Sequence, residues 1–222
     1  MPRSRSDFGG FPPAAFHFYE ELSAQNTKAF WTKHKRDYDE FVRAPFEALA
    51  MVVADEFGPL HVFRPNRDVR FSSDKSPYKT HCGAVTEGDG GEAYYLQISS
   101  SGLMVASGYY GFARDQLERY REAVDSTAGE ALDRLLDSYS KRRFDVGGSV
   151  LKSAPRGYAK DHPQVHLLRH KGVYVSRSFA ITKLLHTRKA LDQIVTTWRA
   201  AAPLHQWLNR HVGPTTEPPG EW

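Results

Sequence analysis

The spacing of hydrophobic residues changes twice along this 222-residue chain, and this change limits the folds open to it. In stretches 30–42 and 46–57 hydrophobic residues recur every three or four positions, which is typical of helices buried on one side. Between about residues 61 and 106 they alternate with polar residues, as in half-buried strands. Helical spacing returns after residue 114, apart from the strand-like "GVYVSRSF" at 172–179. The order predicts an α+β fold, a mostly antiparallel sheet with helices packed on it.

Local signals mark the ends of these elements. Asn26 is a plausible N-cap for the second helix, and Pro45 suits the first turn of the third. The turns "TEGDGGEA" and "SSG" separate three alternating runs by short distances, which favours an antiparallel meander. "DHPQVHLLRHK" is predicted to be a short helix, and the last helical stretch, 182–212, is expected to break near Pro203.

The domain organisation is predicted to be simple. No internal repeat or long low-complexity linker interrupts the chain, so we expect a single α+β domain over residues 8–212. Residues 1–7 and 213–222 are expected to be flexible tails, since "GPTTEPPGEW" holds three prolines and no periodicity.

Composition excludes several classes of protein. The chain is 40% hydrophobic and 25% charged, and no apolar run approaches the ~20 residues of a membrane span. The N-terminal stretch lacks the apolar segment of a secretory signal. Cys82 is the only cysteine and cannot form an internal disulfide, which fits a reducing cytoplasm. No membrane contact is expected, and the oligomeric state is left open.

Charge is unevenly distributed although the net charge is only +4. Eleven lysines and arginines lie between residues 141 and 188, opposed only by Asp145 and Asp161. Solvated helix faces would explain this bias, and so would a surface for an anionic ligand or a nucleic acid.

The stretch "RDVRFSSDKSPYKTH", residues 67–81, carries the strongest indication of a functional site. As a strand–turn–strand it would send Val69 and Phe71 into the core and place Asp68 and Arg70 together on the opposite face. A face open to water would make this a surface ion pair, whereas a covered face would make it the wall of a polar pocket.

Three hypotheses follow for this stretch and the chain. In the first, an anionic and perhaps phosphorylated small molecule is bound by cations and neutral donors, and the candidates are Arg67, Arg70, Ser72, Lys75, Lys79 and, as a more distant partner, Arg121. Asp68 or Asp74 would orient the cations or act as a general base, and Tyr78 would donate a hydrogen bond. The second hypothesis is nucleic-acid binding by region 141–188, and the third is a structural or partner-binding module. Whether the protein is an enzyme is undecided.

Histidine and cysteine spacing gives no cofactor or metal site. His162, His166 and His170 share a helical spacing, but no third ligand completes a zinc motif, so solvated or capping roles are expected. His81 and Cys82 are adjacent strand residues that should point to opposite faces, which argues against a Cys–His pair.

The same stretch resembles the central signature of a widespread family of bacterial and fungal proteins, domain of unknown function 2461. The resemblance runs from about Phe16 to Phe179, and its signature positions are Arg67, Asp68, Arg70, Phe71, Asp74, Lys75, Pro77, Tyr78 and Lys79. "NTKAFWTKHKRDYD" is similar to an earlier segment of the family, with Thr27 in place of its second asparagine. "GYYG", Arg121 and "PRGYAKDHP" also resemble family positions. The resemblance implies a single α+β domain and no known reaction.

Overall fold

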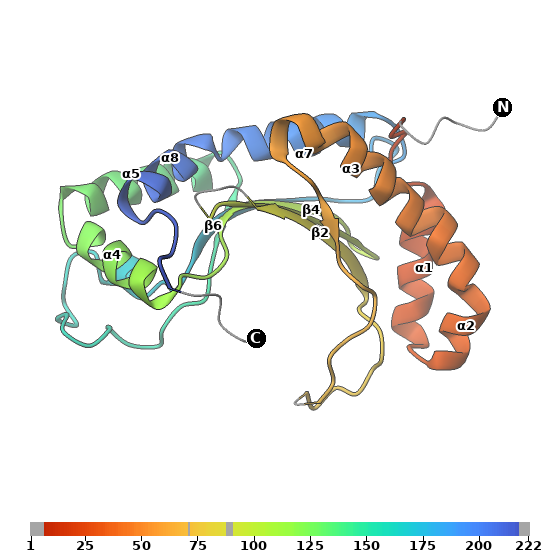
Figure 1. The fold of residues 1–222 in the computed structure, drawn as a ribbon, viewed down its shortest axis with the longest axis horizontal. Helices are drawn as coiled ribbons and strands as arrows, with labels where there is room; N and C mark the ends of the chain where they lie inside the picture. The colour runs from red at the N-terminus through yellow and green to blue at the C-terminus, as the bar shows by residue number, and fades with distance from the viewer. Residues whose placement is uncertain (1–6, 71, 88–90, 218–222) are drawn as a thin grey trace. The chain divides into compact units, whose positions relative to one another are not determined.

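The computed structural model describes residues 7–70, 72–87 and 91–217, and it confirms the predicted α+β fold. A six-stranded antiparallel sheet has the order β1-β2-β3-β4-β6-β5 (Figure 1). The strands are β1 (His61–Val62), β2 (His81–Glu87), β3 (Ala93–Ser99), β4 (Gly102–Tyr109), β5 (Asp145–Gly147) and β6 (Val173–Phe179). The expected meander is therefore β2–β3–β4, three neighbouring strands, and the centre of the predicted turn "TEGDGGEA" lies outside the described residues.

Helices precede, interrupt and follow the strands. They are α1 (Pro13–Ala24), α2 (Lys28–Asp37), the π-helix η1 (Tyr38–Arg43), α3 (Ala44–Phe57), α4 (Arg114–Val124), α5 (Thr127–Lys141), α6 (Val165–Leu168), α7 (Lys189–Ala200) and α8 (Ala202–His211). The chain divides into two compact units. Unit 1 takes the described residues of 1–86, 95–105 and 178–196, and unit 2 takes those of 87–94, 106–177 and 197–222. One domain over 8–212 stays a prediction.

In unit 1 the strands bury one face under helices. α3 runs along this face of the sheet (Figure 1). Alternation along the strands sends Cys82, Ala84 and Thr86 of β2 to the buried side, together with Leu96 and Ile98 of β3. The Thr86 hydroxyl donates to the carbonyl oxygen of Phe57 at 2.5 Å, which ties β2 to the end of α3.

Unit 2 has its own core, in which α4, α5 and α8 contribute side chains around β6. Tyr120 and Leu208 are fully buried there, and the Trp207 indole donates to Ala128 O at 3.0 Å. The segment after α8 continues along α4, because Thr215 Oγ1 donates to Asp115 Oδ1 at 2.7 Å. Hydrogen bonds thus attach the first residues of the expected C-terminal tail.

The helical path from α2 to α3 passes through the π-helix η1. Its last turn is closed by the Ala44 amide, which donates to Asp39 O five residues earlier. Pro45 follows and has no amide hydrogen, and its ring would clash with the carbonyl four residues before it in a regular α-helix. The wider turn accommodates this proline without ending the helical path.

The connection from β1 to β2 differs from the prediction. β1 spans two residues only, so the alternation that begins at about residue 61 does not continue as a strand into the stretch 67–81. His61 pairs with Val85, whereas Asn66 pairs with Tyr78. Relative to the first register, the second strand therefore holds two extra residues before Gly83, a bulge that bends the chain away from the sheet.

This bulge also changes the predicted direction of two side chains. Val69 is only partly buried and does not belong to the core. Its predicted core position is therefore wrong, because the irregular chain beyond Asn66 has no sheet on which to alternate. Phe71 lies outside the described residues.

Two helix-end predictions also need correction, and one is confirmed. Thr27, and not Asn26, caps α2, since its hydroxyl accepts from the Phe30 amide at 3.1 Å. α6 covers only Val165–Leu168 of the predicted 161–171 helix. The break near Pro203 is confirmed, because α8 begins at Ala202 with this proline in its first turn.

Arg143 adopts a backbone conformation that favours glycine. Its φ is 62°, and the amides of Phe144 and Arg143 donate to Tyr139 O and Ser140 O, which forms a Schellman motif after α5. We expect Arg143→Gly to raise the free energy of urea unfolding by about 0.5–1 kcal/mol, because it removes left-handed strain. Arg142→Gly is the matched control and should lower it, since Arg142 has an ordinary φ of −89°. An unchanged or lower stability for Arg143→Gly would contradict this.

Candidate functional site

The β1–β2 connection forms an arm, residues 63–80, that leaves the sheet and returns to it (Figure 1). Backbone hydrogen bonds close its two sides, from Lys79 N to Pro65 O at 2.8 Å and from Arg67 N to Pro77 O at 2.9 Å. Most of the signature stretch therefore lies on one closed excursion of the chain.

Tyr78 anchors the arm to the helices of unit 1. The Asn26 side chain donates to Tyr78 O at 2.9 Å and accepts from Tyr78 N at 3.2 Å, so it pairs with this backbone as a neighbouring strand would. The Tyr78 ring is buried and stacks on Trp31, with centroids 4.3 Å apart and planes 12° from parallel. The two segments that resemble the family are thus joined here, and Asn26 serves this junction instead of capping α2.

At the tip of the arm, charged residues bind each other. The Arg70 guanidinium donates to both carboxylate oxygens of Asp68, at 2.7 Å from Nη2 to Oδ2, and Arg67 forms an ion pair with Asp74. Lys75 Nζ donates to Val69 O at 2.9 Å. The Arg70 side chain is 77% exposed, so its pair with Asp68 is a surface ion pair.

The two aspartates of the tip are weak bases. The Arg70 side chain lowers the pKa of Asp68 to about 2, with help from the Arg70 amide. Hydrogen bonds from the Ser76 hydroxyl and amide, and then from Arg67, hold the pKa of Asp74 well below its usual range. A general base works best with a pKa near the operating pH, so the geometry favours the orienting role over proton abstraction.

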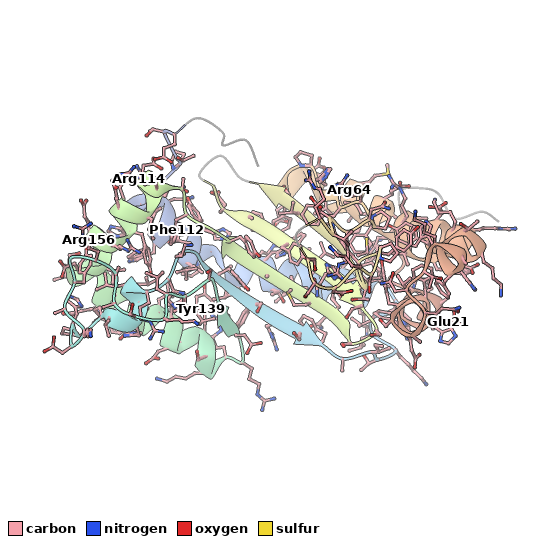
Figure 2. All side chains as sticks on the ribbon, turned by 90° about the horizontal axis from the view of Figure 1, so that it is seen from below. Glu21, Arg64, Phe112, Arg114, Tyr139 and Arg156 are labelled. Carbon is pink, nitrogen blue, oxygen red and sulfur yellow. The ribbon has the colours of Figure 1, made fainter. Side chains whose placement is uncertain are left out.

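Where the arm meets the sheet, a cluster of basic side chains forms no ion pair with a carboxylate of the described residues. We call Arg64, Lys79 and His81 the arm-base cluster; Figure 2 labels Arg64. Burial lowers the pKa of Lys79 and the charge of Arg64 lowers it further. Burial, Lys79 and then Arg67 lower the pKa of His81. Within the described residues no ion pair or hydrogen bond neutralises the Lys79 or Arg64 side chain, and Lys79 Nζ lies 5.3 Å from the Phe63 ring centre.

Neutral polar groups lie on the adjoining face of the sheet. His81 and Gly83 of β2 and Tyr95 and Gln97 of β3 point away from the helices, since their strand neighbours are buried under them. A Cβ atom at Gly83 would lie 2.5 Å from the Tyr95 hydroxyl, so only glycine lets this ring rest on β2. The Tyr95 hydroxyl donates to Gln97 Oε1 at 2.8 Å. The arm-base cluster, which includes the predicted ligand residue Lys79, thus adjoins a polar face of the sheet.

Other predicted residues lie apart from this cluster. Ser72 is on the tip, where its amide donates weakly to Val69 O at 3.4 Å. Arg121 is on α4 in unit 2, whereas the signature residues belong to unit 1, so its part in the same site stays a prediction. Arg64 and His81 were not among the candidates, although both stand within a few residues of the signature and carry basic side chains.

The three spaced histidines bind three different groups. His162 Nε2 lies 2.8 Å from Asp125 Oδ1, and its Nδ1 accepts from the Gln164 amide. His166 Nε2 lies 2.8 Å from Asp133 Oδ1. His170 Nδ1 lies 3.3 Å from Gly172 O, just before β6. No group of three or more metal-binding side chains is present among the described residues. The observed partners fit capping and surface pairing.

A buried Ser–His pair and a buried cysteine resemble catalytic groups, but their surroundings do not activate them. Ser107 Oγ donates to Ala93 O at 3.0 Å, so its contact of 3.0 Å with His205 Nε2 must use the proton of the histidine. His205 therefore cannot activate Ser107. Burial also raises the pKa of Cys82 to about 11, which suppresses its thiolate.

The basic region 141–188 is divided between the two units. Most of its cations are in unit 2, but Lys183 and Arg188 belong to unit 1, where Arg188 pairs with Asp7 at 2.7 Å. Arg142 lies over the rings of Tyr139 and Phe144. Nucleic-acid binding stays a prediction.

Together these observations define an α+β protein whose antiparallel sheet bears a charged arm between its first two strands. A family model described as "Conserved hypothetical protein (DUF2461)" matches residues 14–207. The chain belongs to this family, as its signature segments predicted. A search of curated proteins finds none that matches. Among the described residues, no helix has the length and apolar character needed to cross a membrane.

Proposed function

We propose that the protein binds an anionic small molecule at the arm-base cluster. The observation that carries the proposal is the pair Lys79 and Arg64, two cations that raise each other's energy and form no ion pair within the described residues, although Arg64 is close enough to Asp68 to help lower the pKa of that carboxyl. An oxyanion between them would relieve this repulsion and form charge-assisted hydrogen bonds. A partly buried cation with a shifted pKa is a common mark of a ligand site.

The remaining signature residues would shape this site. The pairs Asp68–Arg70 and Arg67–Asp74 stiffen the tip, and Tyr78 fixes the arm to the helices. Tyr95 and Gln97 offer neutral polar atoms on the neighbouring strand. In this proposal Arg70 and Lys75 have structural roles. Of the ligand-binding cations predicted from the signature stretch, Lys79 is the one that would contact the anion. Arg67 is close enough to help lower the pKa of His81. The lone buried Cys82 supports a reducing cytoplasm as the location.

Phosphate titration of single variants tests the proposal. We expect inorganic phosphate to bind the natural protein saturably in calorimetry and to raise its Tm. Lys79→Gln and Arg64→Gln should each weaken binding about tenfold or more, since a charge-assisted hydrogen bond contributes roughly 1.5–3 kcal/mol. Affinity should also fall as the pH rises, because Lys79 loses its proton at a lower pH than an ordinary lysine.

Two controls make this result specific. Arg70→Gln removes a cation that Asp68 already neutralises at the exposed tip, and it should leave the phosphate affinity within about twofold. Lys33→Gln removes an exposed cation of α2 and should also change nothing. If Arg70→Gln weakens binding as much as Lys79→Gln, the site is at the tip and the proposal is wrong.

A further inference from the structure

A second group of unsatisfied polar atoms lies in unit 2, on α4 and the segment that packs against it. Arg121 Nε and Gln164 Oε1 are both buried, and neither atom has a hydrogen-bond partner among the described residues. A buried polar group left without a partner costs about 1–3 kcal/mol. Such groups are rare in native proteins and often mark the place of a water molecule or a ligand.

Several contacts bring the segment around Gln164 against α4. The Tyr120 hydroxyl donates to Leu167 O at 3.0 Å inside the core. His162 Nε2 meets Asp125 Oδ1 at 2.8 Å just after the last turn of α4, and the Tyr158 ring packs edge-on against His162. Arg121 stands between these two connections along the helix.

The Tyr158 hydroxyl is a second donor near Arg121. Burial raises the pKa of Tyr158, Asp125 raises it further, and the positive charge of Arg121 opposes both, so the guanidinium is close enough to act on the phenol. No hydrogen bond to the Tyr158 hydroxyl is found in the described part of the chain. Two neighbouring donors are therefore available together.

No acidic side chain of the described residues forms an ion pair with Arg121. Glu122 and Asp125 both influence Tyr158, yet neither forms an ion pair with Arg121 in the described ranges. Asp125 is instead held by His162. Arg121 lies in the last turn of α4, where the helix dipole stabilises a positive charge. This interaction does not explain why Arg121 Nε is buried without an acceptor among the described residues.

We propose that Arg121 and Tyr158 bind the oxyanion of a small ligand, a carboxylate or a phosphate, and that Gln164 accepts from a hydroxyl of the same molecule. This site belongs to unit 2, whereas the arm-base cluster belongs to unit 1. Arg156, two positions before Tyr158 in the chain and labelled in Figure 2, is an exposed cation of the same segment. A hydroxylated acid matches this set of donors and acceptor.

The arginine Nε–H signals in ¹⁵N-resolved NMR test the site directly. The Arg121 signal, assigned by its loss in Arg121→Lys, should shift saturably when acetate, glycolate or phosphate is added. The Arg134 signal is the matched control in unit 2, because this exposed arginine of α5 already pairs with Glu130. It should not shift saturably. Equal shifts of both signals, or no shift of Arg121 up to about 50 mM, a concentration that still reveals millimolar binding, would overturn the proposal.

Variants separate the parts of the site. Tyr158→Phe should weaken binding about fivefold or more by removing one donor. Glycolate should bind more tightly than acetate in the natural protein and equally in Gln164→Leu; equal affinity already in the natural protein would remove Gln164 from the site. Repeating the titration in Lys79→Gln keeps this test independent, since loss of the arm-base site should leave the Arg121 shifts unchanged.

Discussion

Replacing Asn26 with alanine should lower the free energy of unfolding of unit 1 by about 2–4 kcal/mol. The substitution leaves both the N–H and the C=O of the Tyr78 backbone without the partners they have now, and each unsatisfied buried group costs about 1–3 kcal/mol. Tyr78 is itself buried against Trp31, so water replaces the lost amide only where this packing opens. Urea unfolding and the Tm measure the loss.

Two neighbouring variants define the cause. Asn26→Asp keeps the acceptor for Tyr78 N but sets a carboxylate against Tyr78 O, so it should be destabilised at neutral pH. Gln25→Ala changes an exposed side chain one position earlier and should stay within about 0.5 kcal/mol of the natural protein. The arm should also become a site of proteolysis in Asn26→Ala alone. If Asn26→Ala matches Gln25→Ala in stability, the amide does not hold the arm.

The native Cys82 thiol should react with a disulfide reagent at least about a hundredfold more slowly than the unfolded chain at pH 8. A pKa of about 11 instead of the ordinary 9.0 leaves roughly one hundredth of the thiolate, and burial adds a barrier to the reagent. The rate of thiol release in buffer and in urea gives the ratio.

A folded-state control extends this test. Tyr38→Phe removes a hydroxyl that hydrogen-bonds to the thiol and stabilises its charged form, so it should not raise the rate while the fold persists. A native rate within tenfold of the unfolded one would mean that the thiol is accessible and ionised, and Cys82 would then have to be reconsidered as a nucleophile.

The sequence predicted the fold class and most strands because alternation and helical spacing are local signals. β3, β4 and β6 and the break at Pro203 all follow from them. The arm was not predicted, because its bulge adds two residues. Because the number of extra residues is even, polar and apolar residues keep the same alternation before and after the bulge. The sequence pattern therefore continues past the point where pairing in the β1–β2 register stops.

For the candidate site, the sequence predicted a segment rich in cations but could not separate paired from unpaired charges. Arg70 and Lys79 have similar side chains and both lie in the signature, yet Asp68 neutralises one and no described acid meets the other. Whether each cation meets an acid depends on where the folded chain places it, since Arg70 stays at the tip of the arm beside Asp68 whereas Lys79 returns to the sheet. Asn26 illustrates the same limit, since a good capping residue was used for a contact 52 positions away.

The π-helix at 38–43 makes this segment more tolerant of losing a residue than the helices on either side of it. A π turn holds about one residue more than an α turn. The segment between α2 and α3 therefore contains one residue more than a continuous α-helix would need to keep the buried faces of both helices in place. Removing one residue there would let the turn relax to α-helical geometry while both flanking helices keep their present faces. An insertion or deletion inside α3 would instead rotate everything after it by about 100° and expose Leu49 or Val53. The first segment to tolerate a change of length in this region is therefore the one that looks most irregular.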